Sequence, residues 1–240
     1  MNINETWGNI EWTTHARKLL FGIKKFPEDS KIIILIRHSE RNELKSVWDT
    51  NELLLTPDGH RIAKKLGENL PIDRFIYIFT SHATRCQETA EDILKGFLSK
   101  GGNGKIIGNL EPLYKIGVER DFFLKQIENG DLIEYLQNWI NGSFPKEKAQ
   151  SIMSYSINAA KIIWASLNNA SKGSIYLHVT HEIPIMAFRY GWFNLLPNDK
   201  WVNFLGAIAF TLHNGKILLF DIDRFLTLEF PKWWNTKNFE

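Results

Sequence analysis

Residues 31–41 read KIIILIRHSER, an uninterrupted apolar run that ends in a cluster of ionisable side chains. The run at 32–36 is short and rich in β-branched residues, so it predicts a strand buried on both faces, as is usual in a parallel sheet. Residues that follow such a strand lie at the carboxyl edge of the sheet, where open α/β folds bind their ligands. The sequence therefore predicts a ligand site at Arg37, His38 and Arg41, and the arginines indicate an anionic ligand.

The composition sets broad limits on the kind of protein. At 240 residues the chain is long enough to bury a full core, and we expect one domain over residues 1–240. A formal net charge of +2, with no long basic run, gives no indication of a nucleic-acid partner.

The single cysteine excludes an intrachain disulfide and fits a reducing compartment. No apolar stretch is long enough to span a bilayer and no secretory signal is visible, so we expect a cytoplasmic protein without a membrane partner. The oligomeric state is not indicated.

Further segments predict the rest of the fold. Residues 74–79 and 174–179 are apolar runs that predict two more buried strands, and Thr56-Pro57 has the capping hydroxyl and early proline of a helix start. We expect a three-layer α/β/α fold with a mainly parallel central sheet and a partly helical inserted cap at about 111–145. The cap and the polar segment 42–52 are expected to shape the substrate pocket.

Polar side chains follow each of the three predicted strands. Arg37 and His38 follow the first, Arg85 follows the second, and His181 and Glu182 follow the third. The carboxyl ends of parallel strands meet at one edge, so these side chains are expected to converge. Such a set suits phosphoryl transfer, because a neutral imidazole attacks phosphorus, guanidinium groups stabilise the phosphoryl oxygens, and a carboxylic acid protonates the leaving alcohol.

At this point the residues resemble a known family. The pair Arg37-His38 after a buried strand resembles the RH signature of the histidine phosphatase superfamily, which includes the phosphoglycerate mutase-like proteins and the acid phosphatases. The similarity covers about residues 32–90 and 174–187. Four motifs in the order of the family carry it: Arg37-His38, the helix start Leu55-Thr56-Pro57-Asp58-Gly59 with Leu66-Gly67, the set Ser81, Arg85 and Thr89, and finally His181.

The resemblance implies a role for each matching residue. It implies that His38 is the nucleophile that becomes phosphorylated, that Arg37 and Arg85 hold the phosphoryl group, and that His181 completes the phosphate pocket. Arg41 occupies the second arginine position of the RHxxR form found in the acid phosphatase branch, which implies a further phosphate contact. The resemblance also implies a phosphoglycerate mutase-like fold and chemistry that needs neither metal nor cofactor.

The proton donor has two candidates. In the acid phosphatase branch an acidic residue follows the second histidine, and Glu182 occupies that position. In the mutase-like branch the donor is a glutamate in the middle of the chain, for which Glu111 is the best match. The RHxxR form together with His-Glu favours Glu182, and Glu111 is the alternative.

Two residues depart from the family pattern. Ser39 stands where the family usually has glycine, and its side chain is expected to crowd or hydrogen-bond the site. His82 stands where mutase-like members often have proline, and it is a candidate substrate contact. The extended signature of true phosphoglycerate mutases is missing, which favours hydrolysis over mutase activity.

The predicted function is therefore a metal-independent phosphatase that works through a phosphohistidine on His38. Its substrate is expected to be a small phosphorylated molecule or a phosphoprotein. The alternatives are a mutase-like phosphotransferase and a non-catalytic protein that binds phosphate esters on the same fold. A metal-dependent hydrolase with His38 and His181 as ligands is disfavoured, because compact ligand spacing is missing and the arginines repel a cation.

Overall fold

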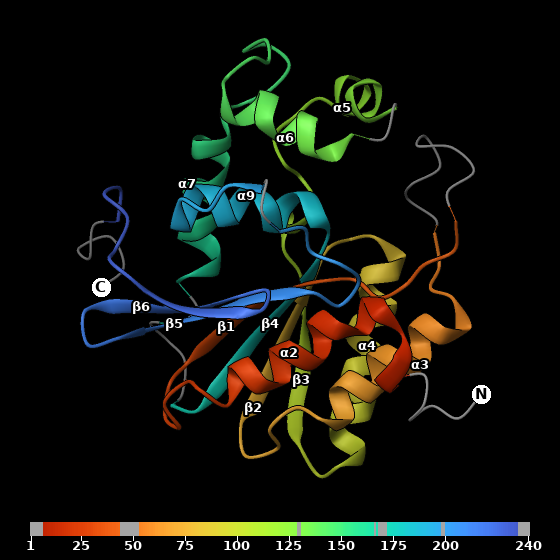
Figure 1. Cartoon of the computed structure of the whole chain (residues 1–240). Helices are drawn as coiled ribbons and strands as arrows, with labels where there is room; N and C mark the ends of the chain where they lie inside the picture. Colours follow the sequence, from red (N-terminus) through yellow and green to blue (C-terminus); the bar gives the residue numbers. More distant parts are fainter. Residues whose placement is uncertain are drawn as a thin grey trace.

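The structure is a computed structural model, which describes residues 7–43, 53–128, 131–165, 167, 172–197 and 200–234. Most of the polar segment 42–52 therefore lies outside the described residues. Seven strands form a single sheet in the order β3-β2-β4-β1-β5-β6-β7, which places β1 near the middle (Figure 1). The strands are β1 (Ile32–Arg37), β2 (Phe75–Thr80), β3 (Asn103–Asn109), β4 (Ser174–Thr180), β5 (Ala207–His213), β6 (Lys216–Asp221) and β7 (Arg224–Leu228).

The sheet is parallel on one side of β1 and antiparallel on the other. The pairings β1–β4, β2–β4 and β2–β3 are parallel. The pairings β1–β5, β5–β6 and β6–β7 are antiparallel, so the last three strands form a meander along one edge. The predicted α/β class and the first three predicted strands are confirmed, and the four strands β1 to β4 point their carboxyl ends the same way.

Helices cover both faces of the sheet. The helices α2, α3 and α4 lie on one face, and α7 and α9 lie on the other, with α5 and α6 beyond α9 (Figure 1). No helix in the described part of the chain is long and apolar enough to cross a membrane. The helical elements are η1 (Glu11–Thr13), α2 (Thr14–Ile23), α3 (Pro57–Glu68), α4 (Thr84–Ser99), η3 (Glu111–Leu113), α5 (Arg120–Ile127), α6 (Leu132–Ile140), α7 (Ile152–Ile163) and α9 (Glu182–Phe193).

The apolar run of β1 joins the two cores. Ile34 packs into the core under α2, α3 and α4, whereas Ile33 and Leu35 pack into the core under α7 and α9. This alternation follows from the two-residue period of a strand, and it explains why every side chain of the run is apolar. The segment 111–145, which was expected to be an inserted cap, contributes η3, α5 and α6, and α6 packs on α9.

A pair of glycines lets α3 and α4 approach closely. A Cβ atom on Gly67 would lie 2.0 Å from the carbonyl oxygen of Ile93, and one on Gly96 would lie 2.0 Å from the carbonyl oxygen of Lys64. Both distances are too short for any side chain. The two helices therefore pack backbone against backbone near their carboxyl-terminal ends.

We expect the substitution Gly96→Ala to lower the free energy of unfolding by about 1–3 kcal/mol, because the added methyl group forces the two helices apart. The loss should appear even though alanine favours a helix over glycine by about 1 kcal/mol. Urea denaturation measures it. The control is Lys95→Ala at the neighbouring exposed position, which should stay within about 0.5 kcal/mol of the unchanged protein. An equal stability of all three proteins would contradict the close-packing argument.

Candidate active site

The end of β1 is held on both sides by backbone hydrogen bonds. The amide of His38 donates to the carbonyl oxygen of Thr180 at the end of β4, at 2.9 Å. The amide of Arg37 donates to the carbonyl oxygen of Gly206, just before β5, also at 2.9 Å. Neighbouring strands therefore fix the backbone from which both side chains project, at the carboxyl edge of the parallel strands, where the sequence predicts the site.

His38 is a buried, neutral imidazole with a defined tautomer. Its Nδ1 lies 2.8 Å from the carbonyl oxygen of Ser39, so this nitrogen carries the proton and donates. Its Nε2 accepts a hydrogen bond from Nε of Arg85 at 3.1 Å, which requires a lone pair on that atom. Burial, and then the electrostatic repulsion that a protonated ring would meet from His181, Arg85 and Arg37, hold the pKa of His38 well below its ordinary value. The nucleophilic nitrogen that the motif predicts is therefore unprotonated.

His181 shares the same guanidinium. Its Nδ1 lies 3.2 Å from Nη2 of Arg85, and its Nε2 lies 2.9 Å from Oγ of Ser81. Because Arg85 can only donate, His181 accepts at Nδ1 and donates from Nε2 to the serine hydroxyl. Burial, followed by the charges of Arg85 and Arg37, lowers its pKa well below the ordinary value. The centroids of the His38 and His181 rings are 5.4 Å apart.

The spacing of the motif in α4 has a physical reason. Residues four apart lie on one face of a helix, and this face points at the end of β1. On this face the hydroxyl of Thr89 accepts from the amide of Ser39 at 3.0 Å and donates to the carbonyl oxygen of Arg85 at 2.6 Å. One helix thus supplies the guanidinium and supports the backbone beside the candidate nucleophile.

Ser39 does not line the site as expected. Its side chain is fully buried, and its hydroxyl donates to the carbonyl oxygen of Gly59 at 2.7 Å, toward α3. The expectation that Ser39 crowds the site or binds substrate therefore disagrees with the geometry, because the hydroxyl is already engaged on the far side of the loop. Its role in the structure is to attach the loop after His38 to the start of α3.

The start of α3 holds the same loop. The hydroxyl of Thr56 caps the helix by accepting from the amide of Gly59 at 2.9 Å, and it lies 2.6 Å from Oε2 of Glu40. A Cβ atom on Gly59 would lie 2.1 Å from the carbonyl oxygen of Glu40, so only glycine allows this approach. The second predicted motif therefore acts by positioning the loop after the candidate nucleophile.

Arg37 lies beside the two imidazoles in a mixed environment. Its Nη2 donates to Oε1 of Glu182 at 2.8 Å, and its Nη1 donates to the carbonyl oxygen of Val202 at 3.0 Å. Its guanidinium lies 4.5 Å from the ring centroid of Phe204, in a cation–π contact. Its Nε is buried and has no hydrogen-bond partner among the described residues.

Arg41 and Glu182 complete the group of charges. Burial lowers the pKa of Arg41, and Glu182, Arg85 and Arg37 are the charges that act on it. Its Nη1 donates to the carbonyl oxygen of Asn42 at 2.9 Å. The guanidinium groups of Arg85 and Arg37 and the carboxylate of Glu182 lie at the paired histidines, an arrangement that suits an anion.

Glu111 and His82 lie away from this group. The side chain of Glu111 is 63% exposed and forms an ion pair with Lys115 at 2.5 Å, and this partner lowers the pKa of Glu111. His82 is also exposed. The centroid of its ring lies 4.5 Å from that of the Tyr114 ring, and its Nδ1 lies 3.1 Å from Nδ2 of Asn109. Of the two candidate proton donors, Glu182 is the one that the structure brings to the arginines.

Two contacts of the site were not predicted from the sequence. Phe204 lies under Arg37, and its ring centroid is 5.7 Å from that of His38. Val202 contributes only its backbone carbonyl. Both belong to the loop before β5, which follows no catalytic motif. The sequence around them contains no recognisable pattern. They reach the site only because β5, which is far from β1 in the sequence, pairs with β1 in the sheet.

Comparison with known proteins agrees with the motifs. The family model described as histidine phosphatase superfamily (branch 1) matches residues 33–100, which run from β1 to the end of α4 and include His38 and Arg85. This match confirms the resemblance to the histidine phosphatase superfamily. The search of curated proteins found no match.

Solved structures share the fold. A phosphoserine phosphatase from Entamoeba histolytica, in complex with 3-phosphoglyceric acid, has a TM-score of 0.56 and 21% identity, covering 80% of this chain and 95% of its own. A mycobacterial glucosyl-3-phosphoglycerate phosphatase in complex with inorganic phosphate has a TM-score of 0.52 and 14% identity, covering 76% of this chain and 90% of its own. At these identities the likeness shows the fold alone, and the different substrates in these names show that the fold does not determine the substrate.

The lowered pKa of His38 predicts how the first chemical step depends on pH. The imidazole stays unprotonated to lower pH than a free histidine, so attack should not be lost near pH 6.5. With para-nitrophenyl phosphate, and after correction for the substrate's own second ionisation, kcat/KM should change less than about threefold from pH 7.5 to 5.5. A histidine of ordinary pKa would give about a tenfold fall over this range. Rapid-quench measurement of phosphoenzyme formation distinguishes the two outcomes.

Proposed function

We propose that this chain is a metal-independent phosphatase that hydrolyses a phosphomonoester through a phosphohistidine on His38. The observation that supports it most directly is the unprotonated Nε2 of His38, which faces the guanidinium shared with His181. An imidazole whose other nitrogen is tied to a carbonyl group presents its lone pair in one direction. A phosphoryl group placed between His38 and the arginines lies in that direction.

The phosphoryl oxygens take over the donors of the site. Nε of Arg85 turns from Nε2 of His38 to a phosphoryl oxygen, which frees the lone pair of the nucleophile at the moment of binding. The buried Nε of Arg37 supplies a second donor, and Arg41 adds charge. These groups stabilise the negative charge that the transition state distributes over the phosphoryl oxygens. Nε2 then bonds to phosphorus while the bond between phosphorus and the ester oxygen breaks.

Glu182 supplies the proton to the leaving oxygen. In the free protein it accepts from Arg37, and both side chains are largely enclosed. A bound dianion competes for that guanidinium, which leaves the carboxyl group of Glu182 free to exchange a proton with the leaving oxygen. After donation, the carboxylate accepts a proton from the water that attacks the phosphohistidine, which releases phosphate and restores His38. Glu111 is the alternative donor.

The first test is the substitution His38→Ala. It should abolish turnover and the acid-labile labelling of the protein by a phosphorylated substrate, because it removes the nitrogen that the proposal assigns to the attack. Turnover of the unchanged protein should persist in excess chelator. The matched control is His60→Ala, which removes a histidine of α3 that pairs with Asp92 and should keep labelling intact.

Three outcomes would count against the proposal. They are retained turnover in a folded His38→Ala protein, loss of activity in chelator that one metal restores, and tight phosphate binding by the unchanged protein without turnover of any phosphomonoester. Circular dichroism and thermal melting of each variant separate loss of chemistry from loss of the fold.

A second test identifies the proton donor. Glu182→Gln keeps the size of the side chain and an acceptor for Arg37 but has no proton to give. It should lower kcat for butyl phosphate by about 100-fold or more, whereas para-nitrophenyl phosphate, whose leaving group needs little protonation, should lose less than about tenfold. Glu111→Gln should change neither substrate by more than about twofold.

The other outcomes of this comparison are equally informative. The larger loss on butyl phosphate in Glu111→Gln assigns the donor to Glu111. An equal loss on both substrates in Glu182→Gln shows that Glu182 only holds Arg37 in place.

A further inference from the structure

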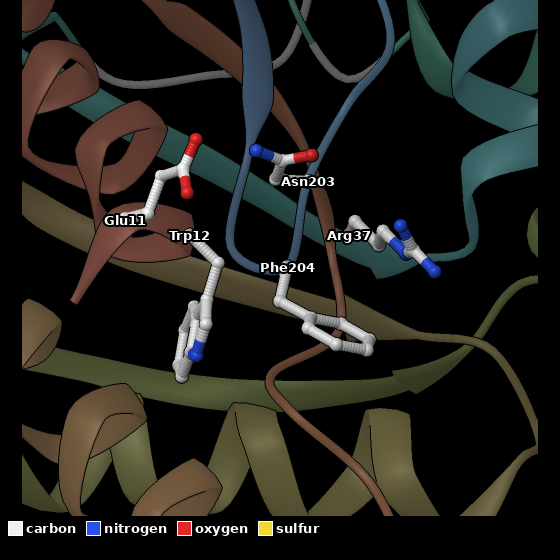
Figure 2. Close-up of a pocket in the computed structure, with 5 residues that line it drawn as sticks. All are labelled: Glu11, Trp12, Arg37, Asn203 and Phe204. Atoms are coloured by element: carbon white, nitrogen blue, oxygen red, sulfur yellow. The ribbon is translucent and has the colours of Figure 1, made fainter. Parts of the chain in front are cut away.

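A groove opens beside Arg37, between the N-terminal segment and the loop before β5. Its volume is about 350 Å³, within the range of sites for small molecules. Figure 2 shows the Trp12 and Phe204 rings side by side, with Arg37 beyond Phe204. We call it the N-terminal groove, and it is lined by Glu11, Trp12, Arg37, Asn203 and Phe204.

The groove shares Arg37 with the candidate phosphate site. The Arg37 guanidinium lies 4.5 Å from the Phe204 ring centroid. The centroid of the same ring is 5.7 Å from that of His38 on one side and 5.8 Å from that of Trp12 on the other. A group attached to a phosphoryl unit at His38 can therefore extend across Phe204 and meet the indole of Trp12.

The walls of the groove are anchored by hydrogen bonds. The hydroxyl of Thr13 donates to the carbonyl oxygen of Ile10 at 2.7 Å, which fixes the turn that carries Glu11 and Trp12. The amide of Asn203 donates to Nδ1 of His15 at 3.3 Å, which ties the opposite wall to α2. The N-terminal segment and the loop before β5 therefore form one preformed surface.

The chemistry of the walls indicates what fits. The two aromatic rings meet edge to face, at an interplanar angle of 84°, and offer a flat apolar contact to another ring. Glu11 is exposed at the rim, where its carboxylate opposes a second anionic group on the ligand. The matched family segment begins at residue 33, so Glu11 and Trp12 lie outside it.

We propose that the N-terminal groove binds the alcohol portion of the substrate and selects an aromatic group that carries no carboxylate. This inference rests on the proposed function for its place in catalysis, but binding alone can test it. Three phosphonates share one ethyl linker and cannot be hydrolysed: ethylphosphonate, phenethylphosphonate and carboxyethylphosphonate. Their dissociation constants, measured by calorimetry at low salt, report the preference of the groove without any turnover.

The unchanged protein should bind phenethylphosphonate about tenfold more tightly than ethylphosphonate, and carboxyethylphosphonate more weakly than either. Trp12→Leu keeps apolar volume but removes the ring, so it should weaken phenethylphosphonate about fivefold and leave ethylphosphonate unchanged. Glu11→Gln should tighten carboxyethylphosphonate about twofold to threefold. The control is Phe21→Ala, which removes an aromatic ring of α2 that is 70% exposed, and it should alter no constant.

Equal affinities of the unchanged protein for the phenyl and ethyl compounds would overturn the inference. So would an equal weakening of both by a folded Trp12→Leu protein, because the indole would then make no contact that is specific to the phenyl group. If phenethylphosphonate is preferred and yet no phosphomonoester is hydrolysed, the groove stands and the proposed function fails. If His38 is labelled but the protein shows no preference for phenethylphosphonate, the proposed function stands and the inference about the groove fails.

Discussion

The shared guanidinium of Arg85 is the interaction on which the candidate site depends. It donates to His38 through Nε and to His181 through Nη2, so both imidazoles must be neutral and present a lone pair to it. The N–H group of His38 donates a hydrogen bond to the carbonyl oxygen of Ser39, and the N–H group of His181 donates one to the hydroxyl of Ser81. A proton added to either ring would place a second cation beside a buried one, where charges are poorly screened. The candidate site is therefore preorganised to bind an anion.

The parts of the fold that follow local rules could be predicted from the sequence. The apolar run before Arg37-His38 and the capped start of α3 at Thr56 were both confirmed, because strand and cap signals are short-range. The direction of the Ser39 side chain could not be predicted, since it depends on the approach of Gly59 from another element. Phe204 was missed for a similar reason, because β5 brings it to the site and no motif surrounds it.

The one thiol near the site illustrates why position alone does not make a nucleophile. The Sγ atom of Cys86 lies 3.7 Å from Nε2 of His181 and next to Arg85 in the chain, yet burial raises its pKa to about 12. A thiol of that kind stays protonated and weakly reactive. Its small apolar side chain packs with Ile78 and Ala90 in the core under α3 and α4. The neutral imidazole of His38, by contrast, needs no deprotonation to attack.

The central place of β1 affects how the protein is made. Within the described part of the chain this strand pairs with β4 and β5, and a contact at its end, from Arg37 to Val202, joins residues 165 positions apart. During synthesis the apolar strand therefore leaves the ribosome long before either neighbour exists. Non-local pairing of this kind slows folding, and an unpaired apolar strand is a template for aggregation. The apolar strand therefore has neither of these neighbours until the chain has been translated past residue 174, and lacks the second until it has been translated past residue 207.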